Sequence, residues 1–199
     1  MLLIDASEKV CGVWEYLIRT PAAEILALPD LVRGVGVDEY AICQEARWLL
    51  GFWCNAGAAV PSKSPSTWNA DHGSNWNNAG RARVARQVDS IRHWRVIRGT
   101  YRDAPDAPAT WFIDPPYQGR AGSYYPAGSG SIDYGDLGAW CRSRAGQVMA
   151  CEGPDADWLP FRPIATIKGC DGARRTGKSA EVVWCADGWA LATQEELPL

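Results

Sequence analysis

The chain has 199 residues, of which 47% are apolar and 22% are charged, and its formal net charge is -3. This length supports a hydrophobic core without disulfides or metals, and the slightly acidic balance excludes a uniformly basic nucleic-acid-binding protein. The seven cysteines include no CxxC pair and are accompanied by only two histidines, which argues against a structural zinc site.

The apolar start, residues 1–4, is too short for a signal sequence, and no later run has the length of a membrane span. Single, scattered cysteines are typical of a reducing compartment. We therefore expect a soluble, cytoplasmic protein with no membrane partner.

The first half of the chain predicts one strand followed by helices. Residues 1–5 (MLLID) have the pattern of a buried strand that ends in an acid, and residues 6–20 place apolar side chains at helical spacing. Further helices are predicted over residues 38–54 and 79–94, with the arginines of the latter facing outward. Between them, residues 55–80 are rich in Gly, Ser, Asn and Pro, which predicts a long loop.

The second half is richer in strands. Strands are predicted over residues 94–101, 109–114, 147–152, 163–169 and 180–186, with a short helix over residues 134–145. Strands that alternate with helices favour an α/β fold with a mostly parallel sheet, and the last two strands, which no helix separates, favour an antiparallel hairpin. We expect a single domain over residues 1–199, with its ligands at the carboxyl ends of the strands.

The sequence DPPY, residues 114–117, directly follows an apolar strand. The exocyclic amino group of a nucleobase is a poor nucleophile because its lone pair is delocalised, and hydrogen-bond acceptors help to localise that pair. Asp114 offers one acceptor, and the carbonyl of Pro115, aimed by the restricted backbone of Pro115 and Pro116, offers a second. Tyr117 offers a face on which a flipped base can stack. These four residues form the predicted catalytic site; the alternative for Asp114 is a turn or helix-cap acid.

DPPY after an apolar strand resembles the fourth motif of the amino-methyltransferases, in the form typical of adenine-N6 DNA methyltransferases. The chain as a whole most resembles the Dam-like (D12 class) enzymes of phages and prophages. The resemblance implies a Rossmann-like methyltransferase sheet, S-adenosyl-L-methionine as cofactor, DNA as substrate, and direct methyl transfer to adenine N6 in the host cytoplasm. A cytosine-N4 enzyme remains an alternative, although its motif usually begins with Ser.

Two other segments resemble cofactor-binding motifs of this family. Residues 2–17 (LLIDASEKVCGVWEYL) resemble the second motif, whose acid holds the ribose hydroxyls of the cofactor, and this role falls on Asp5. Residues 94–105 (WRVIRGTYRDAP) resemble the third motif, which lies against the adenine of the cofactor, with Tyr101 and Asp103 as candidates. The alternative for Asp5 is a strand-end acid that caps the next helix.

Contacts with DNA are predicted in two loops, at Arg174, Arg175, Lys178, Asn69 and Asn77. Residues 172–179 (GARRTGKS) match the spacing of a phosphate-binding loop, but a strand is predicted after them where that loop needs a helix. A basic hairpin loop that rests on the DNA backbone is the better interpretation. The asparagines lie in the loop of residues 55–80, which is placed either as a target-recognition insert or as an ordered surface loop.

The family's first motif, a strand with a glycine-rich turn, has no counterpart before Asp5. In the family's sheet this strand lies between the strand that ends at Asp5 and the one that ends at Asp114. Its absence predicts two half-sheets with unpaired inner edges. We expect one of three outcomes: a second polypeptide supplies the strand, the start codon is misassigned or the gene is truncated, or the two half-sheets pair directly. Direct pairing would leave cofactor binding weak or absent. A non-catalytic remnant that binds DNA or a partner subunit without cofactor is the alternative function.

Overall fold

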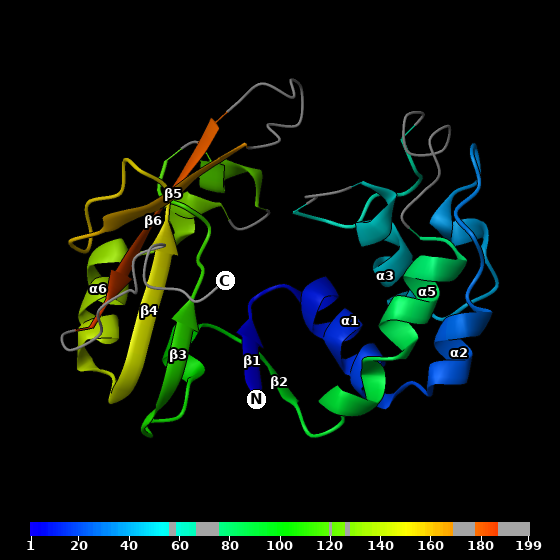
Figure 1. The fold of residues 1–199 in the computed structure, drawn as a ribbon, viewed down its shortest axis with the longest axis horizontal. Helices are drawn as coiled ribbons and strands as arrows, with labels where there is room; N and C mark the ends of the chain where they lie inside the picture. Colours follow the sequence, from blue (N-terminus) through cyan, green and yellow to red (C-terminus); the bar gives the residue numbers. More distant parts are fainter. Residues whose placement is uncertain (56–58, 67–75, 120, 126–127, 169–177, 187–199) are drawn as a thin grey trace, which may run out of the picture. The chain divides into compact units, whose positions relative to one another are not determined.

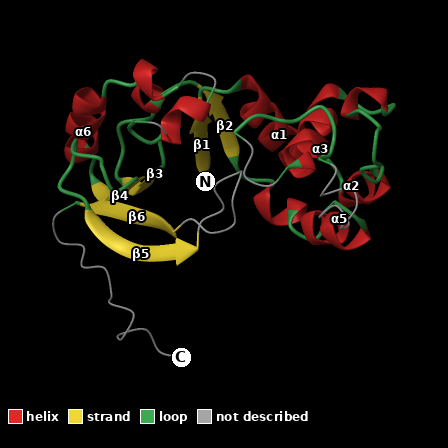
Figure 2. Cartoon of the chain, turned by 90° about the horizontal axis from the view of Figure 1, so that it is seen from above, coloured by secondary structure: helices red, strands yellow, loops and turns green. Residues whose placement is uncertain are grey.

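The computed structural model describes residues 1–55, 59–66, 76–119, 121–125, 128–168 and 178–186. The chain divides into two compact units, Met1–Ala104 and Pro105–Leu199, and each is described by itself. Figure 1 shows the elements of both units, coloured along the sequence, and Figure 2 shows the same elements by type.

In its described residues, the first unit combines a two-stranded parallel sheet with four α-helices. Its elements in chain order are β1 (Leu2–Asp5), α1 (Glu8–Arg19), α2 (Ala22–Ala27), α3 (Gln44–Cys54), α5 (Asn78–Ala85) and β2 (Arg95–Arg98). Short 3-10 turns lie at Val37–Glu39, Val88–Ile91 and Tyr101–Asp103. The strands pair in register from Leu2 opposite Arg95 to Asp5 opposite Arg98, so both carboxyl ends lie at one edge of this sheet.

The core of the first unit lies among its helices, where Ile25, Leu50 and Trp76 are almost completely buried. Helices α1 and α3 approach closely because position 12 is glycine: a Cβ atom at Gly12 would lie 2.6 Å from the ring of Trp48. Because Trp76 belongs to this core and donates from Nε1 to the carbonyl of Pro29, it anchors the end of the 55–80 loop.

Two predicted helices of this unit are shorter in the structure. The one expected over 38–54 begins at Gln44, because a 3-10 turn and an irregular segment precede it, and the one expected over 79–94 ends at Ala85. The prediction that the arginines of the latter face outward is wrong for Arg81. This guanidinium is 7% exposed and binds Asp30 and Asn78, and these polar partners compensate for its burial.

The second unit contains a four-stranded sheet. Its elements are β3 (Ala109–Ile113), α6 (Tyr134–Ser143), β4 (Gly146–Glu152), β5 (Arg162–Lys168) and β6 (Lys178–Cys185), with 3-10 turns at Ala121–Tyr124 and Ser129–Ser131. The strand order is β3-β4-β6-β5, with β3 and β4 parallel and β6 antiparallel to both of its neighbours. The predicted hairpin and the predicted α/β class, with parallel and antiparallel pairing, are thereby confirmed.

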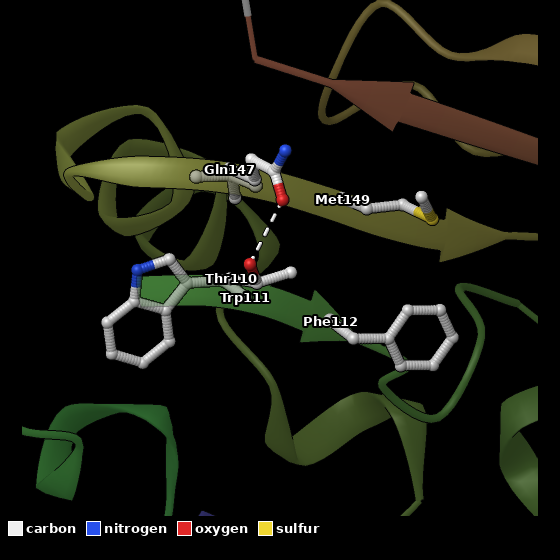
Figure 3. Close-up of a pocket in the computed structure, with 6 residues that line it drawn as sticks. Thr110, Trp111, Phe112, Gln147 and Met149 are labelled. Carbon is white, nitrogen blue, oxygen red and sulfur yellow. Dashed lines mark hydrogen bonds between the residues drawn. The ribbon is translucent and has the colours of Figure 1, made fainter. Parts of the chain in front are cut away.

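The two faces of the β3–β4 pair differ. On one face, Trp111 of β3 contacts Trp140 of α6 edge to face at 5.5 Å between ring centroids, and Val148 and Ala150 of β4 are buried. On the other face, Phe112 is 66% exposed beside Met149, and Thr110 binds Gln147 at 3.0 Å, around a shallow apolar depression (Figure 3). In the described part of the chain, no helix is long and apolar enough to cross a membrane.

Candidate functional site

Asp114 lies immediately after β3, at the carboxyl end of a strand that is parallel to β4. Taken as a whole, the residue is exposed to solvent. The surrounding protein nevertheless raises its pKa, first through desolvation and then through the negative charge of Glu181, with a smaller contribution from Glu152. A hydrogen bond from Tyr117 acts in the opposite direction. Asp114 is therefore a stronger proton acceptor than an ordinary aspartate.

Tyr117 is half-buried and is held by its hydroxyl group. Its Oη donates to Oε2 of Glu181 on β6 at 2.8 Å. Burial raises the pKa of this phenol well above its ordinary value, and the hydrogen bond to Glu181 and the charges of Asp114 and Glu181 add to the shift. The phenol therefore stays protonated near neutral pH and acts as a hydrogen-bond donor.

Glu152, the last residue of β4, is completely buried. Its Oε1 accepts from the backbone N–H of Gln118 at 2.8 Å and from Nε1 of Trp158 at 3.1 Å. Its Oε2 accepts from the backbone N–H of Gly153 at 2.7 Å. Three donors thus compensate a buried carboxylate, and one of them ties the segment that follows Tyr117 to the end of β4.

Two further contacts hold the same segment. The hydroxyl of Tyr134, the first residue of α6, donates to the carbonyl of Pro116, and burial followed by the charge of Glu152 raises the pKa of Tyr134 to about 12. Gly122 packs so closely that a Cβ atom there would lie 2.0 Å from the carbonyl oxygen of Tyr117. The DPPY segment, residues 114–117, is consequently fixed by its neighbours as well as by its two prolines.

Sequence reasoning found the DPPY segment but missed the residues that support it, namely Glu152, Glu181, Tyr134 and Gly122. The sequence gives only weak signals for them. Glu152 is an acid at the end of an apolar strand and Glu181 an acid inside another, and such acids are common in α/β proteins. The structure brings these residues together at one edge of the sheet. Pro115 stays a predicted acceptor, since the carbonyl with a protein donor is that of Pro116.

The predicted cofactor residues lie in the first unit, at the carboxyl edge of its sheet. Asp5, the last residue of β1, is half-exposed, and its Oδ1 accepts from the backbone N–H of Ser7 at 2.6 Å. Asp103 accepts from the backbone N–H and the hydroxyl of Thr100 and so caps the 3-10 turn that begins at Tyr101. The cap of α1 itself is Ser7, so Asp5 supports the turn before the helix rather than the helix end.

The predicted DNA contacts fall mainly outside the described residues. This holds for Asn69, Arg174 and Arg175, and for Lys178 the structure describes only its place as the first residue of β6. A phosphate-binding loop is followed by a helix, whereas Lys178 begins a strand, so this segment does not have the structure that such a loop requires. Asn77 is described: its Oδ1 caps α5 by accepting from the backbone of the second and third residues that follow it.

The arginine-rich stretch of residues 81–102 is largely engaged within the first unit. Arg92 donates to the carbonyls of Ile18 and Thr20 at the end of α1, and Arg98 lies 3.8 Å from Glu8. Arg83 and Arg102 lie over aromatic rings, those of Trp53 and Tyr101 respectively. These contacts favour a structural role for much of this stretch over a DNA-binding patch.

Within the described residues, no group of three or more His, Cys, Asp or Glu side chains is arranged to hold a metal ion. The six cysteines in this part of the chain are free thiols. A scan against models of known protein families finds no match for the chain, and a search of curated proteins finds no similar sequence.

Proposed function

We propose that the chain is an S-adenosyl-L-methionine-dependent DNA methyltransferase acting on adenine N6, and that a second polypeptide supplies a further strand to its sheet. The observation that carries this proposal is the strand order of the two sheets. In a doubly wound sheet the first strand lies in the middle, the second and third strands follow on one side, and the fourth and fifth on the other.

With one added first strand, β1 and β2 take the second and third places of such a sheet, and β3 and β4 take the fourth and fifth. The parallel directions of β1 with β2 and of β3 with β4 agree with this assignment. Asp5 then ends the second strand and Asp114 the fourth, which are the places that the resemblance to amino-methyltransferases assigns to the ribose acceptor and to the catalytic acid. A Rossmann-like sheet is therefore part of the proposal.

The edges of the two sheets support a missing strand. Among the described strands, β1 pairs with β2 alone and β3 with β4 alone. The edge strand β3, with the sequence ATWFI, carries no charge and no proline, the features that usually protect an exposed edge. Parallel strands normally lie in larger sheets that are covered on both faces. We therefore propose a second polypeptide as the source of the strand.

The chemistry follows from the DPPY segment. The carboxylate of Asp114 and the carbonyl of Pro115 accept the hydrogens of the target amino group, which localises its lone pair on nitrogen. The ring of Tyr117 supports the flipped base. When bound, S-adenosylmethionine supplies an electrophilic methyl group, and Asp5, Tyr101 and Asp103 are the residues that would hold it. Asp5 fits this role because it is a half-exposed acceptor at the carboxyl end of a parallel strand.

The raised pKa of Asp114 also serves the end of the reaction. The amino nitrogen must lose a proton once it carries the methyl group, and the carboxylate of Asp114 is the acceptor that already binds its hydrogens. A raised pKa increases the affinity of that carboxylate for the proton. The rest of the catalysis comes from positioning, for which the contacts of Glu152, Tyr134 and Gly122 provide a fixed segment.

The test is methyl transfer from labelled S-adenosylmethionine to DNA of mixed sequence, followed by digestion to nucleosides. We expect label in N6-methyladenine with the wild-type chain, alone or fused to a strand with a glycine-rich turn, and none with Asp114→Ala. The matched control is Asp155→Asn, which removes one exposed charge from the same unit and keeps wild-type activity. A folded chain that labels no DNA in either form contradicts the proposal.

The unpaired edges of β1 and β3 equally favour the alternative, a non-catalytic remnant that binds DNA or a partner subunit. Calorimetric titration with S-adenosylmethionine separates the two functions. Saturable binding that Asp5→Ala weakens supports the enzyme, whereas DNA binding without cofactor binding in the fused and unfused chain supports the remnant.

A further inference from the structure

Glu181 lies at the same edge of the sheet as Asp114, although the two residues come from strands that are not neighbours. β4 runs parallel to β3 and ends at Glu152. β6 is antiparallel to β4, with Val182 opposite Glu152, so Glu181 lies one residue beyond the end of that pairing. The strand order therefore places the carboxylate of Glu181, in addition to those of Asp114 and Glu152, near the carboxyl ends of β3 and β4, where the DPPY segment begins.

The hydroxyl of Tyr117 donates to Oε2 of Glu181 at 2.8 Å. The same side chain lies three residues after Asp114 and lowers the pKa of that carboxyl, so Asp114 is the other acceptor within its reach. A phenol has a single hydrogen to donate, so the two carboxylates compete for it. When Glu181 holds the hydrogen, the oxygens of Asp114 remain available to a ligand that donates hydrogens of its own.

We propose that Glu181 is a positioning residue that holds the Tyr117 hydrogen and thereby keeps Asp114 open as the acceptor for the amino group of the substrate. This inference rests on the proposed function for its substrate, but the competition itself is a property of the chain alone. Without Glu181, the Tyr117 hydroxyl turns to Asp114 and occupies the acceptor.

The electrostatics of the site make the competition measurable. Glu181 raises the pKa of Asp114 by its charge, while the hydrogen bond from Tyr117 lowers it. Removing Glu181 changes both contributions in the same direction, since the repulsion disappears and the Tyr117 hydrogen moves to Asp114. The pKa of Asp114 is therefore expected to fall in Glu181→Gln and further in Glu181→Ala, which lacks any acceptor at this position.

The first experiment titrates the Asp114 carboxyl in the full chain by carbon NMR of labelled aspartate, with Asp114→Asn to assign the signal. We expect the pKa of Asp114 to decrease in Glu181→Gln and Glu181→Ala and to stay unchanged in Asp155→Asn. An unchanged Asp114 titration in folded Glu181→Ala overturns the inference. This readout needs neither cofactor nor DNA.

The second experiment compares methyl-transfer rates at saturating DNA and cofactor. Glu181→Ala is expected to lower kcat about tenfold, the scale of one hydrogen bond, with little change in the KM for DNA. Adding Tyr117→Phe keeps the aromatic ring but removes the competing hydrogen, so the double variant should be several-fold faster than Glu181→Ala. A double variant that is no faster than Glu181→Ala overturns the inference.

The two experiments distinguish this inference from the proposed function. A wild-type chain that transfers no methyl group refutes the proposed function, whatever the NMR titration gives. If the wild type is active but the pKa of Asp114 is the same in the wild type and in Glu181→Ala, the inference is refuted and the proposed function is not.

Discussion

Replacing Glu152 by glutamine tests whether a buried carboxylate holds the DPPY segment. The substitution keeps the size and shape of the side chain but turns one of its two acceptor oxygens into a donor. In the native protein Oε1 accepts from Gln118 and Trp158, and Oε2 accepts from Gly153. The best orientation of the amide keeps the first two bonds and sets its NH2 group against the N–H of Gly153.

The expected loss follows from these contacts. One charge-assisted hydrogen bond of about 1.5 to 3 kcal/mol disappears, and the partly buried N–H of Gly153 is left without its acceptor. The two remaining bonds weaken because a neutral oxygen replaces an ionised one. Glutamine also removes the cost of keeping the charge of Glu152 away from water, and this gain offsets part of the lost hydrogen-bond energy. We expect Glu152→Gln to lower the free energy of unfolding by about 2 to 4 kcal/mol.

Urea unfolding followed by circular dichroism measures this change, with Asp155→Asn as an exposed control that alters the net charge equally. Hydrogen exchange adds a local readout, since the amide of Gln118 should lose protection more than the amides of β4. A loss below about 0.5 kcal/mol, within the range of ordinary surface substitutions, would refute the claim that Glu152 anchors this segment.

Three further predictions concern the site and its surroundings. Because the fold raises the pKa of Asp114, the wild-type protein loses stability as the pH rises through that pKa and the carboxyl ionises. The melting temperature of Asp114→Asn should therefore exceed that of the wild type by an amount that grows from acid to neutral pH. A difference in melting temperature that does not change with pH would contradict this. Gly122→Ala places a methyl group against the carbonyl of Tyr117 and should cost about 1 to 3 kcal/mol in thermal unfolding, whereas Gly130→Ala, which enters open space, should be neutral. Asn77→Ala should lower the free energy of unfolding by about 1 kcal/mol because α5 loses its side-chain cap, whereas Asn77→Asp keeps a capping oxygen and should be about as stable as the wild type. Equal melting temperatures of Asn77→Ala and Asn77→Asp would show that this cap does not stabilise the protein.

Much of the fold was accessible from the sequence because the local signals agree with the tertiary structure. The apolar run that ends at Asp5 forms β1, and the helical spacing that follows it forms α1. The sequence predicted no helix between the last two strands, and the antiparallel pairing expected on that ground is confirmed. Among the described strands, the separate two-stranded and four-stranded sheets agree with the two half-sheets expected from the sequence.

Other features depend on contacts between distant residues and left no local pattern. Arg81 follows the helical pattern of an exposed arginine, yet its guanidinium is buried because Asp30, far away in the sequence, provides a partner. Glu152 and Glu181 appear as ordinary acids in strands until the sheet order brings them to the DPPY segment. Local propensity cannot predict such pairs, since they form only after the strands have assembled.

The central claim is that Asp114 and its neighbours activate an amino group of DNA for methylation. The most direct measurement is the transfer of labelled methyl groups to DNA by the wild-type chain and by Asp114→Ala, each assayed alone and fused to a strand with a glycine-rich turn. We predict N6-methyladenine with the wild-type residue only. Unlabelled DNA from a folded wild-type chain in both forms, or equal labelling by Asp114→Ala, would contradict the claim.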